Sequence, residues 1–382
     1  MDFDFTDEQR LLKDSIYRLM ADRYSFEARK AHAASPAGWS ADMWRHYAGL
    51  GLLGLPFSEA HGGFGGGPVE TMIVMEAMGG ALALEPWLAS VVIGGGLLRH
   101  AGSLAQQAAI LPLVAAGTRK LALAQMERHS RHDCANVTAT AHACASGFVI
   151  DGEKSLVLHG DSADVFIVVA RTGGAPTDRT GIGLFLIDAR AKGVTQRSYP
   201  TQDGGRAAEV VFSGVEIAAD AVLGDPAHGL PVLERVIDEA IAALCAEAVG
   251  AMAAMHRLTV DYLKMRKQFG VAIGSFQVLQ HRAADMFVAL EQARSMALLA
   301  TMMVGEQDAK PRRAAMQAAK IQIGRSAKFI TQQAVQLHGG VGVTMEYAIG
   351  HYFKRLTMID SLFGDADHHL GLLAQGVTGI LD

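Results

Sequence analysis

The stretch LFGDADHH, residues 362–369, places two acids and two histidines directly after a Phe-Gly pair. Carboxylates and imidazoles are the side chains that most often carry out acid–base catalysis or bind metals. The spacing does not suit a metal, because His368 and His369 are adjacent and adjacent residues on a helix point about 100° apart. Asp365 is a good helix N-cap, and Asp367 would lie in the first turn, where both favour the helix dipole. The pattern therefore predicts the capped start of a last helix.

Two other motifs combine polar residues with glycines. RKQFG at 266–270 joins two cations to a Phe-Gly stop, and QLHGG at 336–340 ends on two glycines. Each motif alone is typical of a helix C-terminus, where cations favour the dipole and glycine forms the cap. Together they indicate more, because an arginine fork suits a pyrophosphate and glycines let a backbone approach a nucleotide closely.

The overall composition limits the classes of protein to which this chain can belong. A chain of 382 residues with 50% hydrophobic and 19% charged residues predicts two to three domains with substantial cores. The formal charge of −5 and the lack of any Lys/Arg-rich tract exclude a nucleic-acid-binding face. An acidic N-terminus, MDFDFTDEQR, and no long apolar run predict a cytoplasmic protein without membrane insertion. Cys134, Cys144 and Cys245 lack metal-ligand spacing, so structural thiols in a reducing compartment are expected.

Three regions of different periodicity must position these motifs. Residues 1–118 have helical spacing, with Thr6 and Ser40 as N-caps and Pro68 at the start of a helix. Residues 119–228 contain short β-branched runs between Gly, Pro and Asp turns, which predicts a middle antiparallel β domain. Residues 229–382 return to helical spacing, with long helices expected at about 231–268, 275–305 and 312–338. The chain is therefore expected to be an α+β protein that ends in a helical bundle.

Five segments carry a resemblance to a known family. LPFSEAHGGFGGG, GFVIDGEKS, VLGDPAHGL, RKQFGVAIGSFQVLQHRAADM and AVQLHGGVGVTMEY resemble the acyl-CoA dehydrogenase family from end to end of the chain. Within the family, the chain is similar to the small subunits of pimeloyl-CoA dehydrogenases. The resemblance implies an N-terminal helical domain, a β domain and a C-terminal four-helix bundle, assembled as dimers or dimers of dimers around FAD.

The resemblance also implies a reaction. In this family the flavin removes a hydride from the β carbon of an acyl-CoA while a carboxylate takes the α proton, which leaves a trans-2-enoyl-CoA. The implied partners are the acyl-CoA thioester, a second subunit and an electron-transfer flavoprotein as acceptor.

One set of family positions is kept in this sequence. These residues would contact the pyrophosphate and adenosine half of the FAD bound by a neighbouring subunit. By the resemblance, the set consists of Arg266, Gln268 and Phe269, with Ile273 and Phe276 on the same face, and of Gln336, Gly339 and Gly340 in the glycine-rich segment.

A second set of positions is altered. The family holds the flavin ring within one chain by hydroxyl, backbone and aromatic groups on two strands. The matching residues here are Leu123, Gln125, Met126, Leu156 and Leu158, so a Thr hydroxyl and a Trp ring have become aliphatic side chains. An unpaired buried acceptor costs roughly 1 to 3 kcal/mol, so the ring would depend on main-chain N–H donors.

The usual catalytic base is also missing. Counting without gaps from Gln336, Phe363 falls where most members have a glutamate, and Asp365 falls where a Thr or Ser touches the flavin. Other members place the base on the long bundle helix, at Ala240 here, and the neighbouring Glu239 points about 100° away. Asp365 and Glu239 are therefore weak candidates, since a base must come within about 3 Å of its proton.

Two loops have an alternative interpretation. Glu127 and Asp133 match acids near the CoA entrance, in a segment made more basic by Arg128 and Arg131. Those arginines suit a CoA phosphate or the distal carboxylate of a dicarboxylyl chain. The alternative is that they are only solvated loop residues, which is what we expect. GGFGGG at 62–67 is no dinucleotide motif, because no strand precedes it in a βα unit; it matches the family's loop by the acyl pocket.

The contrast between kept and lost positions leads to the main hypothesis. The chain is expected to be the small subunit of an FAD-dependent acyl-CoA dehydrogenase whose larger subunit carries the catalytic glutamate. A homomeric enzyme with Asp365 or Glu239 as base is the alternative within the same class. A non-catalytic structural or acyl-CoA-binding protein is the alternative from another class.

Overall fold

The computed structural model describes residues 4–378, and the chain divides into two compact units. Unit 1 comprises Met1–Ala31, Pro68–Ala83 and Ile241–Asp382, and unit 2 comprises His32–Gly67 and Leu84–Ala240. Each unit is built from segments far apart in the sequence, so the units do not coincide with the three regions of different periodicity. Domain boundaries near residues 118 and 228 stay a prediction. In the described part of the chain no helix is long and apolar enough to cross a membrane.

The helices of unit 2 start where the sequence places their caps. The hydroxyl of Ser40 accepts a hydrogen bond from the Met43 N–H at 3.2 Å, which fixes the start of α3 (Ala41–Gly49). A π-helical turn, η2 (Leu88–Gly94), continues directly into α5 (Gly95–Ala101), and α6 (Leu104–Ala115) begins with a capping box at Ser103. The predicted N-cap is therefore confirmed, and helix formation here follows local hydrogen bonding.

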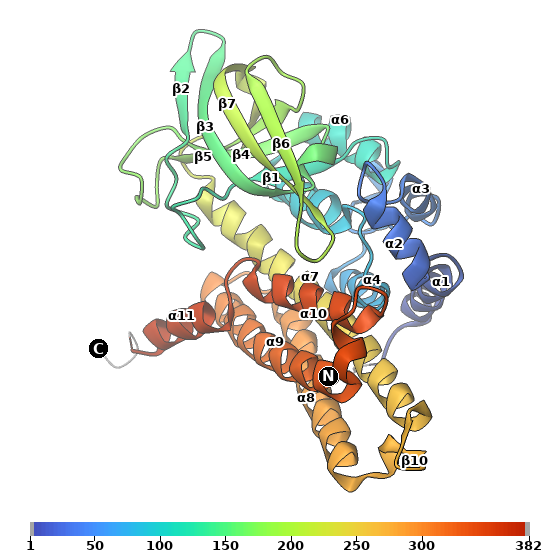
Figure 1. Cartoon of the computed structure of the whole chain (residues 1–382). Coiled ribbons are helices and arrows are strands. Elements are labelled where there is room, and N and C mark those ends of the chain that lie inside the picture. The colour runs from blue at the N-terminus through green and yellow to red at the C-terminus, as the bar shows by residue number, and fades with distance from the viewer. Residues whose placement is uncertain (1–3, 379–382) are drawn as a thin grey trace. The chain divides into compact units, whose positions relative to one another are not determined.

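The sheet of unit 2 has the strand order β6-β7-β3-β2-β4-β5-β8, and β1 pairs with β4 (Figure 1). The strands are β1 (Leu121–Ala124), β2 (Thr140–Cys144), β3 (Gly147–Leu158), β4 (Val165–Arg171), β5 (Ile182–Asp188), β6 (Val194–Pro200), β7 (Arg206–Ala218) and β8 (Val222–Leu223). Phe166, Phe185 and Phe212 are fully buried in its core. The predicted β domain is confirmed.

Two strand pairs differ from the predicted antiparallel pattern. β1 and β2 each pair in parallel with β4. Parallel neighbours need a long connection, and the chain between β1 and β4 is long enough to supply one. Apolar runs identify strands but do not specify which strands pair, so this detail was not accessible from the sequence.

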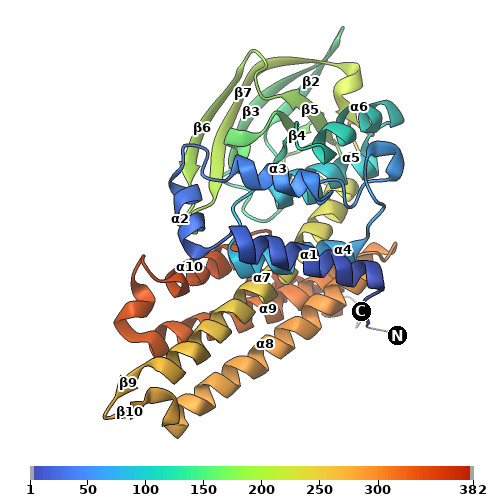
Figure 2. The same cartoon turned by 90° about the vertical axis from the view of Figure 1, so that its right-hand side faces the viewer.

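Unit 1 is helical, and α9 lies at its centre. α9 (Ala309–His338) packs against α8 (Gln277–Met303), α10 (Ala348–Ser361) and α11 (Ala366–Thr378), while α1 (Asp7–Arg23) packs on α4 (Pro68–Ala81) (Figure 2). α7 (Leu230–Met265) contributes its residues from Ile241 onward, and α2 (Phe26–Ala34) crosses the unit boundary. Thr6 caps α1 through a capping box, and Pro68 opens α4, as the sequence predicts.

α4 and α7 cross at backbone contact. A Cβ atom added to Gly79 would lie 1.9 Å from the Glu247 carbonyl oxygen, and one added to Gly250 would lie 1.9 Å from the Glu76 carbonyl oxygen. Real Cβ atoms do not come this close, so glycine is required at both positions. This close crossing sets the distance between two helices of unit 1.

Candidate functional site

The RKQFG motif forms an exposed hairpin after α7. Arg266 precedes β9 (Lys267–Gln268), and the chain returns through β10 (Val271–Ala272) and the turn η5 (Ile273–Ser275). Phe269, at the tip, has a φ of 54° and is 91% exposed; its ring meets Phe276 edge-on at 6.2 Å. In residues 4–378 the side chains of Arg266 and Gln268 have no hydrogen-bond partner. The hairpin therefore presents unused donors to the surface.

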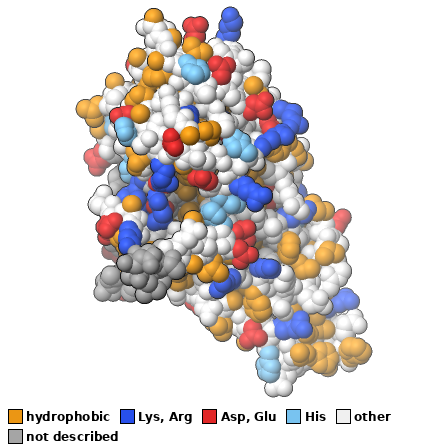
Figure 3. Space-filling model, turned by 90° about the vertical axis from the view of Figure 1, so that its left-hand side faces the viewer, with side chains coloured by type: hydrophobic (Ala, Val, Ile, Leu, Met, Phe, Trp, Pro, Cys, Tyr) orange, Lys and Arg blue, Asp and Glu red, His pale blue; other side chains and the backbone are white. Residues whose placement is uncertain are grey.

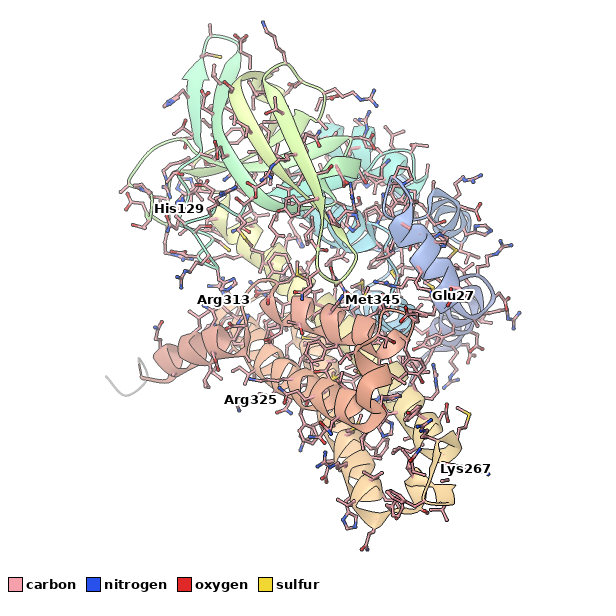
Figure 4. All side chains as sticks on the ribbon, viewed as in Figure 1. Glu27, His129, Lys267, Arg313, Arg325 and Met345 are labelled. Carbon is pink, nitrogen blue, oxygen red and sulfur yellow. The ribbon has the colours of Figure 1, made fainter. Side chains whose placement is uncertain are left out.

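The figures show the same end of unit 1. Lys267 marks the hairpin in Figure 4. Figure 3 shows hydrophobic side chains on the surface at the lower end of the view, the end where Figure 1 places β10 and the beginning of α8. Exposed hydrophobic residues of this segment include Met265, Val271 and Val278. Apolar side chains around unused polar groups are typical of an interaction surface.

The QLHGG motif closes α9 with an open glycine turn. Gln336 is exposed and has no side-chain partner in the described residues, and Gly339 has a φ of 62°. A Cβ added to Gly339 or Gly340 would meet nothing within 4 Å, so both glycines border open space. A backbone of this kind can be approached closely by a ligand.

His338 joins this turn to the end of α7. Its ring lies 4.4 Å from that of Tyr262 and 5.2 Å from that of Tyr347, and its Nδ1 donates to the Ala334 carbonyl at 2.8 Å. Tyr262 in turn accepts through its main-chain oxygen from the Arg266 N–H at 2.8 Å. Burial lowers the pKa of His338, so the ring between the two tyrosines stays neutral at pH 7.

The altered flavin-ring positions lie in unit 2, where β1 ends and β3 runs alongside. Met126 accepts from the Ser155 N–H at 2.8 Å, which joins the two segments. In the described part of the chain the main-chain N–H groups of Gln125 and Met126 have no acceptor. These two main-chain groups are therefore available as donors, whereas the side chains of Leu156 and Leu158 bring no hydrogen-bonding group. Leu156 has a φ of 49°, a strained conformation for a branched side chain.

Glu127 belongs to a buried ion pair beneath those donors. Its Oε1 lies 2.6 Å from Lys154 Nζ, and Thr138 donates to its Oε2 from both main chain and hydroxyl. Burial alone would raise the pKa of Glu127, but Lys154 and the hydrogen bonds outweigh it and lower the pKa. Asp133 caps the same loop, since its Oδ1 accepts from the Ala135 N–H at 2.9 Å. Both acids are structural in this geometry.

The basic side chains of the same loop are solvent-exposed. Arg128 pairs with Glu209 at 2.8 Å, and Arg131 is exposed at a φ of 49°. The pair at Arg128 is a surface ion pair of the kind that contributes little to stability. Nothing buried depends on either arginine.

Phe363 occupies a rigid turn between α10 and α11 in unit 1. Its φ is 57° and that of Gly364 is 105°, both left-handed. The ammonium of Lys320 donates to the carbonyls of Ile359 and Asp360 at 2.6 and 2.9 Å, which satisfies the last turn of α10. A phenyl group at this turn has no atom that accepts a proton.

Asp365 caps α11, as the sequence predicts. Its Oδ1 accepts from the His368 N–H at 2.8 Å, and its carbonyl accepts from the His369 N–H at 3.0 Å. His369 is buried and donates to the Phe363 carbonyl, and its ring meets that of His368 edge-on at 5.4 Å. Within the described residues no group of three or more His, Cys, Asp or Glu is placed to hold a metal.

Glu239 is engaged by cations in unit 2. Arg99 donates to its Oε2 at 2.8 Å, His100 to its Oε1 at 2.6 Å, and Arg235 lies 3.8 Å away. Burial alone would raise the pKa of Glu239, but the His100 hydrogen bond and the surrounding charges lower it. A carboxylate held by two arginines and a histidine is a weak proton acceptor. Ala240, the other base position on α7, is fully buried.

Sequence reasoning missed the buried charges behind the Phe363 turn. Lys320 is fully buried, and burial lowers its pKa to about 8. Asp360 Oδ1 is buried without a hydrogen-bond partner, and burial raises the pKa of Asp360. The nearby thiol of Cys245 has a pKa raised to about 12 by burial. In the sequence, the signal for a buried charge was Lys320 itself, which lies on the apolar face of α9 between Ala319 and Ile321.

Comparison with known protein families gives three matches in chain order. The acyl-CoA dehydrogenase N-terminal domain matches residues 6–118, the middle domain residues 122–215 and the C-terminal domain residues 227–378. Together they span nearly all of the chain.

Individual proteins resemble the chain over its full length. The probable acyl-CoA dehydrogenase YngJ of Bacillus subtilis (strain 168) is 28% identical over 366 residues, which are 94% of this chain and 95% of that protein. The structure of a Tcur3481–Tcur3483 steroid acyl-CoA dehydrogenase variant has a TM-score of 0.88 at 27% identity, covering 98% of this chain and 99% of that one. The FAD complex of PigA has a TM-score of 0.89 at 25% identity, covering 99% of both chains.

Proposed function

Because the chain belongs to the acyl-CoA dehydrogenase family, we propose that it is the small subunit of a heteromeric enzyme whose larger subunit carries the catalytic glutamate. The family is one of oxidoreductases, and FAD is its cofactor. When bound, FAD supplies the hydride acceptor for α,β-dehydrogenation of an acyl-CoA. A dicarboxylyl-CoA such as pimeloyl-CoA is the proposed substrate, and an electron-transfer flavoprotein the proposed acceptor.

One contrast carries the proposal. The exposed side chains of Arg266, Gln268 and Gln336 have no hydrogen-bond partner in residues 4–378. By the resemblance, Phe363 matches the position where most members have the catalytic glutamate. Exposed donors of this kind are hydrated in the lone chain and are available to bind another molecule. In the proposed assembly, Arg266 binds the pyrophosphate of the FAD held mainly by the larger subunit. Gly339 and Gly340 let that nucleotide approach the backbone.

The residues of this chain then position, and do not transfer, the reacting groups. Arg266 offers a planar fork of donors that matches a pyrophosphate. Phe269 and Phe276 shield that contact from water, which strengthens its electrostatics. The proton of the substrate's α carbon passes to the glutamate of the larger subunit, because neither Phe363 nor the engaged Asp365 and Glu239 accept it well.

A heteromeric assembly is consistent with one of the similar solved structures. That structure is described as a Tcur3481–Tcur3483 steroid acyl-CoA dehydrogenase variant, a name that joins two proteins. The exposed apolar residues around the hairpin supply this chain with a surface for such a partner.

The test compares the chain alone with the chain co-expressed with a larger family member that has Glu at the position matching Phe363. Flavin per chain is measured, and flavin bleaching is followed with octanoyl-, adipoyl- and pimeloyl-CoA without oxygen. We expect little flavin in the lone chain and one flavin per pair in the mixture, bleached by acyl-CoA. One flavin per lone chain, bleached by substrate, would overturn the heteromer; no flavin in either sample would favour a non-catalytic protein.

A matched pair of variants sharpens the test. Arg266→Ala is expected to lower the flavin content of the heteromer roughly tenfold, the effect of losing one charge-assisted hydrogen bond. Lys264→Ala, on the exposed end of α7, removes a nearby cation and serves as the control. Equal flavin content in both variants would exclude Arg266 from the cofactor site.

A further inference from the structure

A cavity of about 320 Å³, open to the surface, lies in unit 1 between α1, α4 and α7. This volume is at the lower end of the range for small-molecule sites. Figure 2 shows the three helices together, with α1 alongside α4. The cavity is formed by residues of unit 1 only, and it contains none of the residues assigned above to FAD or to the base.

The walls are made of small residues because α4 and α7 touch. The crossing at Gly79 and Gly250 leaves no room for side chains between the two backbones. Next to the crossing, the cavity is lined by Ala77, Gly80, Ala81, Ala253 and Ala254, with Met20 of α1 opposite. This floor is apolar and suits an aliphatic group.

The rim carries two hydrogen-bond donors that the protein does not use. Arg257 and Tyr17 both line the cavity, and in residues 4–378 neither side chain has a hydrogen-bond partner. The third polar group on the rim, Glu76, is already bound by Arg294 at 2.8 Å. Arg294 also pairs with Glu291 at 3.4 Å, whereas Arg257 forms no ion pair in residues 4–378.

The charges that act on the pKa of Tyr17 show that these groups lie close together. Burial, followed by the charge of Glu76, raises the pKa of Tyr17 to about 12, while Arg294 and Arg257 act in the opposite direction. The phenol therefore keeps its proton at any physiological pH and can only gain by donating it to an acceptor. Two donors on the rim and an apolar floor match a ligand with an acceptor at one end and an aliphatic group at the other.

We propose that this cavity binds a short aliphatic carboxylate, with its carboxylate on Arg257 and Tyr17 and its chain on the alanine and glycine floor. An arginine fork matches a carboxylate in geometry, and the Tyr17 phenol adds a further donor on the exposed rim. The site is separate from the dehydrogenase chemistry and does not depend on the proposed heteromer.

The experiment titrates hexanoate into the purified full-length chain by calorimetry and repeats the titration with two variants. Arg257→Gln removes the charge, and Ala253→Leu fills the floor without changing any charge. We expect hexanoate to bind the unaltered chain and to bind each variant at least roughly tenfold more weakly. Binding to both variants as strong as to the unaltered chain, or no binding to the unaltered chain, would overturn the proposal.

A control variant and two control ligands test the specificity of this cavity. Arg325→Gln removes an exposed cation of α9 far from the cavity lining, marked in Figure 4, and is expected to leave hexanoate binding unchanged. Hexanamide lacks the negative charge of hexanoate, and inorganic phosphate lacks its aliphatic chain. Both are expected to bind at least tenfold more weakly than hexanoate. Phosphate binding as tight as hexanoate would refute a carboxylate with an aliphatic chain as the ligand. Equal melting temperatures of the variants verify that the fold is intact.

Discussion

The imidazole of His369 donates from Nε2 to the main-chain oxygen of Phe363 across 3.0 Å. The bond ties the start of α11 to a residue in a left-handed conformation that a bulky side chain adopts only at a cost. The turn thus keeps a defined geometry, although its side chain has no acid–base chemistry.

Phe363→Leu is expected to change the turnover of the heteromer less than twofold. Leucine preserves an apolar side chain at a turn already fixed by His369 and Lys320, and neither Phe nor Leu can take a proton. Steady-state oxidation of pimeloyl-CoA by the co-expressed pair measures the effect. A tenfold loss of kcat would place the Phe363 ring against the reacting groups and would contradict a purely supporting role.

Asp365→Ala is expected to lower the free energy of unfolding by about 1 kcal/mol, since it removes the N-cap of α11. The rate of flavin reduction by acyl-CoA should not change. Urea denaturation measures the first quantity and stopped-flow absorbance the second. Asp367→Ala, in the exposed first turn of the same helix, is the matched control. It should lower the free energy of unfolding by less than Asp365→Ala does. If flavin reduction stopped in Asp365→Ala alone, Asp365 would be the base.

Lys320→Met is expected to reduce the rise in stability between pH 8 and pH 9. Burial lowers the pKa of Lys320 to about 8 from the ordinary 10.5, so in this window the unfolded chain binds more protons and stability grows with pH. The contribution is roughly 1 kcal/mol per pH unit.

Denaturation curves at several pH values measure the slope of the free energy of unfolding against pH. Above pH 9 the Cys245 thiol, with a pKa of about 12 in place of 9, has the opposite sign, which limits the useful window. Lys154 has the same sign as Lys320 and is present in both proteins, so the difference between the curves isolates Lys320. Lys328→Met, on the exposed face of α9, is the control; an equal slope in both variants would count against a titrating Lys320.

Gly250→Ala is expected to destabilise the chain by about 2 kcal/mol or more. The added methyl would lie 1.9 Å from the Glu76 carbonyl oxygen, so α4 and α7 would have to separate. Thermal unfolding measures the loss. Gly371→Ala in α11 meets nothing within 4 Å and should instead stabilise its helix by about 0.5 to 1 kcal/mol. Equal melting temperatures for the two variants would show that the helix crossing is loose.

Much of the fold was accessible from local patterns. Thr6, Ser40 and Pro68 mark real helix starts because capping depends on residues within one turn. The β region was recognisable from its short β-branched runs, but the parallel pairing of β1 with β4 was not, because pairing is set by distant segments. Asp365 was correctly placed as a cap for the same local reason as Thr6.

The sequence by itself determined the family motifs and the helical end of the chain, since these depend on residue type and short spacing. Only the tertiary structure decided which polar groups are engaged. It placed Arg99 and His100 around Glu239, buried Lys320 behind the Phe363 turn and left Arg266 and Arg257 without partners in residues 4–378. The physical reason is that the pKa and the hydrogen bonding of a side chain depend on neighbours brought close by folding, and one-dimensional spacing does not contain them.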